Sequence, residues 1–443
     1  MFDLLLRNAS VVLPDQVKNL DVAVSNGIIA AFLQPNAPCD AKTVYDLQGC
    51  ILLPGAIDSH AHVTYCGTPA EGSRAAASGG VTTLIEMPAS GWLPDAKTAE
   101  ILLQRKRAVE DSSIVDFALW GGVSCDDLDR VDELHAAGAV AYKAFTCDAG
   151  RYGSFNDAQL LDLLRKVRTF NGLVGVHAEV ASICEASTAR IQAEKGGAER
   201  HSESRPVIAE AVAGVSAAML ANCCKARLHI CHVSSPEVVK ALEPFRQDGL
   251  CLTLETCPHY LLLTDEDVVR CGAYAKCSPP IRDAQQQEGL WQALIHGGLD
   301  IIGSDHANYS DEQKGQEFWK SPGGFPGLCL LLSALYSEGV AKRGMPLTRL
   351  AEVTAANAAK AFGLSHCKGS IEIGKDADFA VIDPEICWTY HAKDFAFAKE
   401  SCHYPYEGRE WRGKVIRTFV RGMQVWDNGA FPLEKGGRVV ARK

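Results

Sequence analysis

The 443-residue sequence predicts an α/β fold, in which a (β/α)8 TIM-like barrel carries a small β-sandwich domain formed by both termini. Three observations support this prediction. The chain is longer than the ~250–300 residues at which a single core stops growing, so a second domain is expected. Its middle alternates strand-like apolar runs with segments of helical spacing. Its two ends instead carry short alternating runs separated by turn residues.

Eight strand-like runs in the middle of the chain are each followed by a helix-like segment. The runs are continuously apolar, as expected for parallel strands that are covered on both faces. They span 56–63, 82–87, 114–121, 139–145, 173–177, 227–233, 250–256 and 300–304. Eight such units favour a closed barrel. An open, doubly wound sheet stays a structural alternative, because a count of strands does not show whether the sheet closes.

The segments between these runs have the spacing of amphipathic helices. Residues 157–167 and 236–245 are two examples, and Asn156 is a candidate N-cap for the first. After the last strand, 347–362 also has helical spacing. It closes the part of the chain that we assign to the barrel domain, residues 54–365.

Both ends of the chain predict antiparallel β-structure. Residues 3–13 and 20–32 alternate apolar and polar side chains around turn residues. Short strand-like runs return near the C-terminus, at 379–382, 415–420 and 424–426. Neither end has a core of its own, so each must pair with another part of the chain. We therefore expect residues 1–53 and 366–443 to form one small β-domain.

Composition narrows the class of partner. The chain has 54 acidic and 44 basic residues and a net charge of −10, which disfavours binding to nucleic acid. No uninterrupted apolar run reaches the ~18 residues needed to cross a membrane, so no membrane partner is expected. The N-terminus lacks the features of a signal peptide. The 17 cysteines include no C-x-x-C pair and fit the reduced thiols of a cytoplasmic protein.

The first predicted barrel strand ends in the motif Asp58-Ser59-His60-Ala61-His62. Residues two apart on a strand face the same side, so His60 and His62 can both face the barrel mouth and hold one metal ion. Taken alone, an H-x-H pair is more often two hydrogen-bonded histidines at a strand end. The motif therefore needs support from other strands.

Polar residues on four further strands favour the metal site. His177, His232 and Asp305 follow or end strands five, six and eight, and Lys143 lies in the apolar fourth strand. A buried lysine is costly unless it is neutralised or paired. Carbamylation by CO₂ would make Lys143 an oxygen donor able to bridge two cations, whereas a salt bridge to Asp305 is the alternative. Five polar strand ends on one face are hard to explain by packing.

Several motifs carry a resemblance to a known family. They lie at 54–62, 79–83, 142–145, 255–261, 303–306 and 369–378. With them the sequence resembles the cyclic-amide branch of the amidohydrolase superfamily, which includes allantoinases, hydantoinases, dihydropyrimidinases and dihydroorotases. The resemblance covers nearly the whole chain. It implies a metal-dependent enzyme that hydrolyses a ring C–N bond of a small cyclic amide or ureide.

The resemblance also implies a role for each polar strand end. Two divalent ions are expected, with Zn²⁺ favoured and Co²⁺ or Mn²⁺ as alternatives. One ion would be held by His60, His62 and Asp305, and the other by His177 and His232, with carbamylated Lys143 bridging both. Asp305 would act as general base and then as general acid. Related enzymes suggest a homotetramer.

Sequence features also rank the possible substrates. Dihydroorotases carry an arginine just after the H-x-H motif, where it binds a substrate carboxylate. This chain has Val63-Thr64 at that place, so the arginine is missing. Hydantoinases and dihydropyrimidinases place a tyrosine a few residues beyond the bridging lysine, whereas the first tyrosine here is Tyr152. The segment that contains Ser278 is allantoinase-like, and Gly323 lies in a loop that mixes both kinds of feature.

We therefore expect hydrolysis of allantoin to allantoate, with Ser278 and Gly323 as substrate contacts. A hydantoinase or dihydropyrimidinase is the alternative. A non-catalytic scaffold, like the collapsin-response mediator proteins that resemble dihydropyrimidinases, is a third reading. Those proteins have lost metal ligands, whereas all six ligand positions are filled in this chain, so the scaffold is disfavoured.

Overall fold

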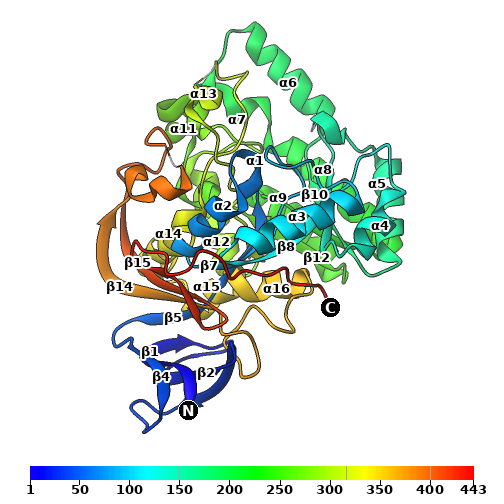
Figure 1. The fold of residues 1–443 in the computed structure, drawn as a ribbon. Helices are drawn as coiled ribbons and strands as arrows, with labels where there is room; N and C mark the ends of the chain where they lie inside the picture. The colour runs from blue at the N-terminus through cyan, green and yellow to red at the C-terminus, as the bar shows by residue number, and fades with distance from the viewer. Residues whose placement is uncertain (149, 316, 400) are drawn as a thin grey trace.

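The computed structural model describes residues 1–148, 150–315, 317–399 and 401–443. Eight parallel strands follow one another in chain order, and helices cover them on the outside (Figure 1). These strands are β6 (Ala56–Ala61), β7 (Val81–Glu86), β8 (Asp116–Gly122), β9 (Ala141–Phe145), β10 (Leu173–His177), β11 (Arg227–Ile230), β12 (Leu252–Thr256) and β13 (Ile301–Ile302). The predicted barrel is confirmed.

The barrel closes just after its last strand. A parallel bridge joins Ala61 of β6 to His306, which follows β13. The backbone N–H of Asp305 donates to the carbonyl of His60 over 2.8 Å. The open, doubly wound sheet is therefore excluded. Closure places the last residues of β6 beside the segment that follows β13, although they are more than 240 positions apart in the chain.

Helices lie between the strands, as the spacing predicted. They are α1 (Val63–Cys66), α2 (Pro69–Ser78), α3 (Ala99–Ser112), α4 (Arg130–Ala136), α5 (Asp157–Arg168), α6 (Ala181–Ala193), α7 (His201–Ser204), α8 (Val207–Cys224), α9 (Pro236–Gln247), α10 (Pro258–Leu262), α11 (Asp265–Cys271), α12 (Ala284–Ile295), α13 (Asp311–Lys314), α14 (Leu331–Leu335), α15 (Leu347–Ala351) and α16 (Asn357–Ala361). Asn156 caps α5, because its side chain accepts from the N–H of Gln159, whose own side chain accepts in return. A π-helical turn, Glu352–Ala356, joins α15 to α16.

One helical stretch, 198–224, is long and apolar enough to cross a membrane by length and composition alone. Its main part, α8, packs against α5 and α9 on the outside of the barrel. A barrel helix that buries one face in this way satisfies the same test of length and composition, so the stretch is weak support for a membrane span.

The strands from both ends of the chain form one mixed sheet. They are β1 (Phe2–Val12), β2 (Val17–Ser25), β3 (Ile28–Leu33), β4 (Ala41–Asp46), β5 (Ile51–Pro54), β14 (Phe379–Thr389), β15 (Glu410–Val420) and β16 (Met423–Asp427). The order is β16-β15-β14-β5-β1-β2-β3, with β4 also on β1. Leu6, Val22, Phe379 and Phe419 belong to its buried core. The predicted β-domain from both termini is confirmed.

The C-terminal tail leaves this sheet and returns to the barrel (Figure 1), where Val439 bridges Phe117 of β8. Beside it lies a buried ion cluster. Lys368 Nζ contacts Asp116 at 2.6 Å, Asp376 at 2.8 Å and Asp378 at 2.5 Å. Because Asp116 is the first residue of β8, the cluster joins the β-domain to the N-terminal end of the barrel.

Candidate functional site

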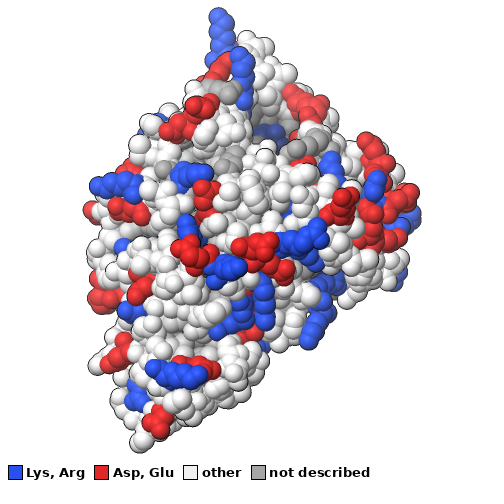
Figure 2. Space-filling view, viewed as in Figure 1, with Lys and Arg blue, Asp and Glu red and all other residues white. Residues whose placement is uncertain are grey.

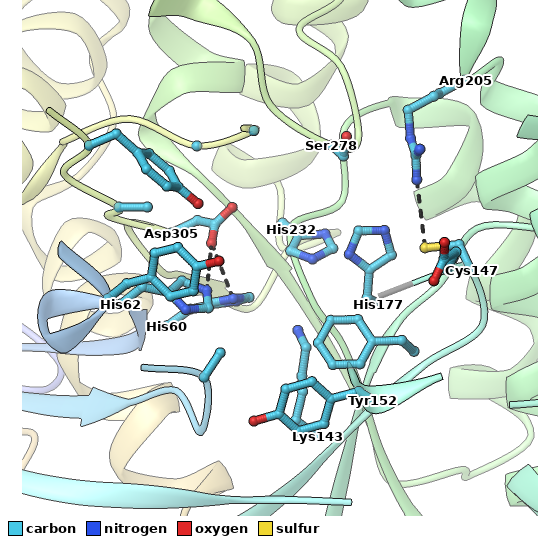
Figure 3. A pocket seen from close by; sticks show the side chains of 18 residues that line it. His60, His62, Lys143, Cys147, Tyr152, His177, Arg205, His232, Ser278 and Asp305 are labelled. Carbon is cyan, nitrogen blue, oxygen red and sulfur yellow. Dashed lines mark hydrogen bonds and ion pairs between the residues drawn. The ribbon is translucent and has the colours of Figure 1, made fainter. Parts of the chain in front are cut away.

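A cavity of about 370 Å³ opens at the C-terminal ends of the barrel strands. All eight residues that the sequence predicted as metal ligands or substrate contacts line it. These are His60, His62, Lys143, His177, His232, Ser278, Asp305 and Gly323. They come from strands β6, β9 and β10 and from the segments that follow β6, β11, β12 and β13, and Figure 3 shows most of them pointing toward a common centre.

The H-x-H motif and Asp305 meet across the closure of the barrel. Asp305 Oδ1 lies 3.2 Å from His60 Nε2 and 3.3 Å from His62 Nε2. Burial raises the pKa of Asp305, but His60 and His62 outweigh it and hold the pKa well below its ordinary value. Asp305 is therefore a carboxylate, and both of these contacts use the same oxygen.

His60 is held from behind by Glu255, the last residue but one of β12. His60 Nδ1 lies 2.8 Å from Glu255 Oε1, so Nε2 is the ring nitrogen that faces the cavity. Burial and Lys143 lower the pKa of His60, but Glu255 and Asp305 raise it to about 10. Two flanking carboxylates thus favour a positive charge at this place, whether a proton or a metal ion supplies it.

Glu255 supports other parts of the site as well. It accepts from Ser59 Oγ at 2.5 Å and from the backbone N–H of His232 at 3.2 Å, and it lies 3.3 Å from His229 Nε2. His229 therefore supports the site through its contact with Glu255. One buried carboxylate connects the two groups of predicted ligands.

His177 and His232 form the second group, with ring centroids 4.5 Å apart. Burial, His177 and Lys143 hold the pKa of His232 well below its ordinary value, so the ring is neutral. Its buried Nδ1 has no hydrogen-bond partner among the described residues. His177 Nε2 lies 2.6 Å from Glu179 Oε2. Carboxylate support on one ring nitrogen leaves the other for a metal ion.

Lys143 lies between the two groups and is 2% exposed. In the part of the chain that the structure describes, its Nζ has no hydrogen-bond partner. The alternative salt bridge to Asp305 is absent from the described ion pairs, because Asp305 instead contacts the two histidines. An amine that is buried without a partner is costly, and carbamylation with metal binding would remove that cost. The donor set therefore fits two divalent cations.

Ser278 and Gly323 lie at the rim, on two segments that pack together. Gly324, next to Gly323, donates its N–H to the carbonyl of Lys276 at 2.8 Å. A Cβ on Gly323 would lie 3.6 Å from Cys277 Cα and 3.8 Å from Ser278 N. A side chain at Gly323 would therefore fill space beside the backbone of Ser278.

The rest of the cavity wall was missed by the sequence analysis. One side is aromatic and includes Tyr65 and Tyr309, whose rings meet edge to face at 5.4 Å. Another side carries Cys147, Asp148 and Arg205. These residues stand on loops and helix ends, where no periodic pattern marks a side chain as facing the cavity. Glu179, which contacts His177 and Arg205 but does not line the cavity, could have been found from the sequence, because it follows His177 by two positions.

Two further histidines near the site do not line the cavity. His306 Nδ1 accepts from the backbone N–H of Gly327 at 3.1 Å. The ring of His259 packs against Tyr260 and Phe325. Burial lowers the pKa of His259 to about 4 and that of His306 to about 3. Both therefore act as neutral packing residues in the wall behind the site.

Comparison with known proteins agrees with this geometry. The amidohydrolase family profile matches residues 51–425. The chain is 36% identical to an allantoinase of Escherichia coli O1:K1 over 100% of its own length and 99% of the relative's. It is 35% identical to an allantoinase of Salmonella newport with the same coverage.

Solved structures of related proteins share the whole fold. The L-hydantoinase (dihydropyrimidinase) of Arthrobacter aurescens superposes with a TM-score of 0.95 at 32% identity, and each chain is fully covered. The dihydropyrimidinase of Brevibacillus agri superposes with a TM-score of 0.91 at 28% identity, over 100% of this chain and 99% of that one. Sequence relatives and structural relatives thus carry different substrate names.

Proposed function

The chain belongs to the amidohydrolase family, and from this premise we propose that it hydrolyses allantoin to allantoate. The family and its relatives make it a cyclic-amide hydrolase. The convergence of four histidines, an aspartate and a buried lysine that has no hydrogen-bond partner among the described residues carries the proposal. The allantoinases that match over the full length support allantoin as the ring that is opened.

Enzymes of this family generally use two metal ions, and the residues present fit such a pair. The proposed ligands are His60, His62 and Asp305 for one ion, His177 and His232 for the other, and carbamylated Lys143 for both. Zn²⁺ suits an imidazole-rich site, and Co²⁺ or Mn²⁺ are alternatives. When bound, the ions would lower the pKa of a water molecule and polarise the ring carbonyl.

Asp305 is the proposed proton carrier. Its Oδ1 contacts both histidines of the H-x-H motif, which leaves Oδ2 to accept a proton from the attacking water. Its low pKa keeps it ready as a base. Asp305 then delivers the proton to the departing ring nitrogen, as general acid. Ser278 would orient the ring amide through its backbone groups, and Gly323 leaves room for the ring beside it.

A substrate panel tests the proposal. Steady-state kcat/KM of the metal-loaded protein is expected to be highest for allantoin, lower for hydantoin and lowest for dihydrouracil. The alternative, a hydantoinase or dihydropyrimidinase, is favoured by the whole-chain superposition on the Arthrobacter enzyme. Faster opening of dihydrouracil than of allantoin would reverse the order.

A metal analysis tests the third reading, a non-catalytic scaffold. We expect close to two equivalents of Zn²⁺, Co²⁺ or Mn²⁺ per chain after growth with that ion. Less than one equivalent, with no ring opening, would favour the scaffold. Incorporation of ¹³C-labelled CO₂ at Lys143, read by NMR or mass spectrometry, tests the carbamate separately.

We also propose that the protein is a cytoplasmic homotetramer made of a barrel, residues 54–365, and a β-domain of residues 1–53 and 366–443. The described cysteines are free thiols, which supports a reducing compartment. The charges on the face in Figure 2 are of both signs and interspersed, which fits a small-molecule substrate rather than nucleic acid. Light scattering of the purified protein would measure the subunit number.

A further inference from the structure

The cavity has a polar side that the proposed chemistry does not use. Figure 3 shows Arg205 and Cys147 beyond His177, on the opposite side of the histidine rings from Asp305. Asp148 lines the cavity as well. A ring that is opened between the two groups of histidines could therefore direct a substituent toward a guanidinium and a carboxylate. Neither the metal ligands nor the proton carrier explains why these two groups face the cavity.

Arg205 is held rigidly from one side. Its Nε contacts Glu179 Oε1 at 2.9 Å and Oε2 at 3.0 Å, and its Nη2 also donates to Glu179 and lies 3.6 Å from Cys147 Sγ. Glu179 is fully buried, and the Arg205 side chain is 20% exposed. A guanidinium fixed in this way loses little conformational entropy when it binds a further group.

The remaining nitrogen of Arg205 is not used by the fold. Among the residues that the structure describes, no hydrogen-bond partner is found for Nη1. Neutralising Glu179 requires only Nε and Nη2. A lysine would supply the same charge with fewer donors. The guanidinium therefore leaves Nη1 as an additional donor that can face the cavity.

Charge and donor pattern together select the class of group that fits. Glu179 already neutralises Arg205, which removes the attraction for a carboxylate. Asp148, whose Oδ1 accepts from the N–H of Gly150 at 2.9 Å, adds an acceptor and repels an anion. A neutral substituent with both a carbonyl oxygen and N–H donors matches this pair. The ureido group of allantoin has both.

We propose that Arg205 and Asp148 determine specificity by binding the ureido substituent of the ring, with Arg205 donating to its carbonyl oxygen and Asp148 accepting from its N–H groups. This inference rests on the proposed function and deepens it. It makes the ring substituent, rather than the ring alone, the feature by which the enzyme distinguishes allantoin from unsubstituted hydantoin.

Arg205→Lys tests the proposal, because it keeps a positive charge beside Glu179 and removes the fork. We expect kcat/KM for allantoin to fall about 10- to 100-fold, as for a lost charged hydrogen bond, while kcat/KM for hydantoin falls no more than about threefold. Metal content is measured in parallel. The matched control is Arg409→Lys, because Arg409 makes a similar two-oxygen contact with Asp267 but does not line the cavity. It should change the allantoin-to-hydantoin ratio less than twofold.

Equal losses for both rings in Arg205→Lys would overturn the proposal and leave Arg205 as a support of His177 through Glu179. Unchanged kinetics on allantoin would overturn it too. If Arg205→Lys does not fold, Asp148→Asn decides: it should lower kcat/KM for allantoin more than for hydantoin, and an unchanged ratio would overturn the proposal. Failure of the proposed function gives a different result, because the wild-type protein itself then does not open allantoin, whether or not it opens hydantoin.

Discussion

Two buried lysines at opposite ends of the barrel have opposite surroundings. Lys143 lies at the cavity and has no hydrogen-bond partner in the described chain, whereas Lys368 contacts three carboxylates at the other end. Their exposures are the same, 2% for each residue. Burial by itself therefore does not distinguish a structural lysine from a functional one, and the partners do.

The partners of Lys368 form a complete network. Burial lowers its pKa, but Asp378, Asp116 and Asp376 outweigh burial and raise it above the ordinary value. The lysine stays charged and connects β8 of the barrel with the segment that enters the β-domain. Lys143 has no such set of carboxylates among the described residues, and the proposed carbamylation and metal binding would account for its burial. A buried amine without hydrogen-bond partners thus indicates a site for a missing ligand.

The largest effect is expected from Lys143→Ala. Activity should be abolished and metal content should fall by at least one equivalent per chain, because the bridging group is lost. Elemental analysis and allantoin turnover measure both quantities. Full metal occupancy in this variant would contradict the bridging role.

Asp305→Asn should lower kcat by about 10²- to 10⁴-fold, the usual contribution of a general acid–base group. The amide keeps the size of the side chain, so circular dichroism should show an unchanged fold. A rate near that of the wild type would remove Asp305 as proton carrier.

Lys368→Met sharpens the comparison from the other side. It leaves three buried carboxylates without their central cation, so the free energy of unfolding should fall by about 3–5 kcal/mol. Urea unfolding at matched metal content measures this loss. Metal content should stay at the wild-type value, in contrast to Lys143→Ala. A loss below about 1 kcal/mol would mean that the cluster does not hold the two domains together.

The smallest effect is expected from Arg438→Ala. Arg438 contacts Asp376 at 2.6 Å, but its side chain is 47% exposed. Ion pairs of this kind contribute about 0–1 kcal/mol. Urea unfolding should therefore show a loss within that range. A loss as large as that in Lys368→Met would mean that the half-exposed Arg438 stabilises the cluster as much as the buried Lys368 does.

Much of the fold followed from local patterns. The eight apolar runs predicted the barrel strands, because parallel strands covered on both faces are continuously apolar. The cap at Asn156 was predicted for a similar local reason. These patterns favoured closure but did not exclude an open sheet, because closure depends on contacts between Ala61 and His306, beside the first and last strands of the barrel.

The candidate site was also predicted only in part. The polar residues at strand ends could be named, because strand direction places them at one mouth. Glu255 and Arg205 were not assigned a role, since each acts through residues far away in the chain. Tyr152 was counted as too distant from Lys143 in sequence, yet a short helical turn, Gly150–Tyr152, returns it to the cavity wall.

The sequence by itself determined the strand pattern, the kinds of ligand atom and the expectation of a metal-dependent hydrolase, because these depend on residue type and spacing along one segment. Only the tertiary structure decided which carboxylate supports which histidine, which buried lysine is paired, and which side chains face the cavity. Those properties depend on distances between segments far apart in the chain, and no local pattern records such distances.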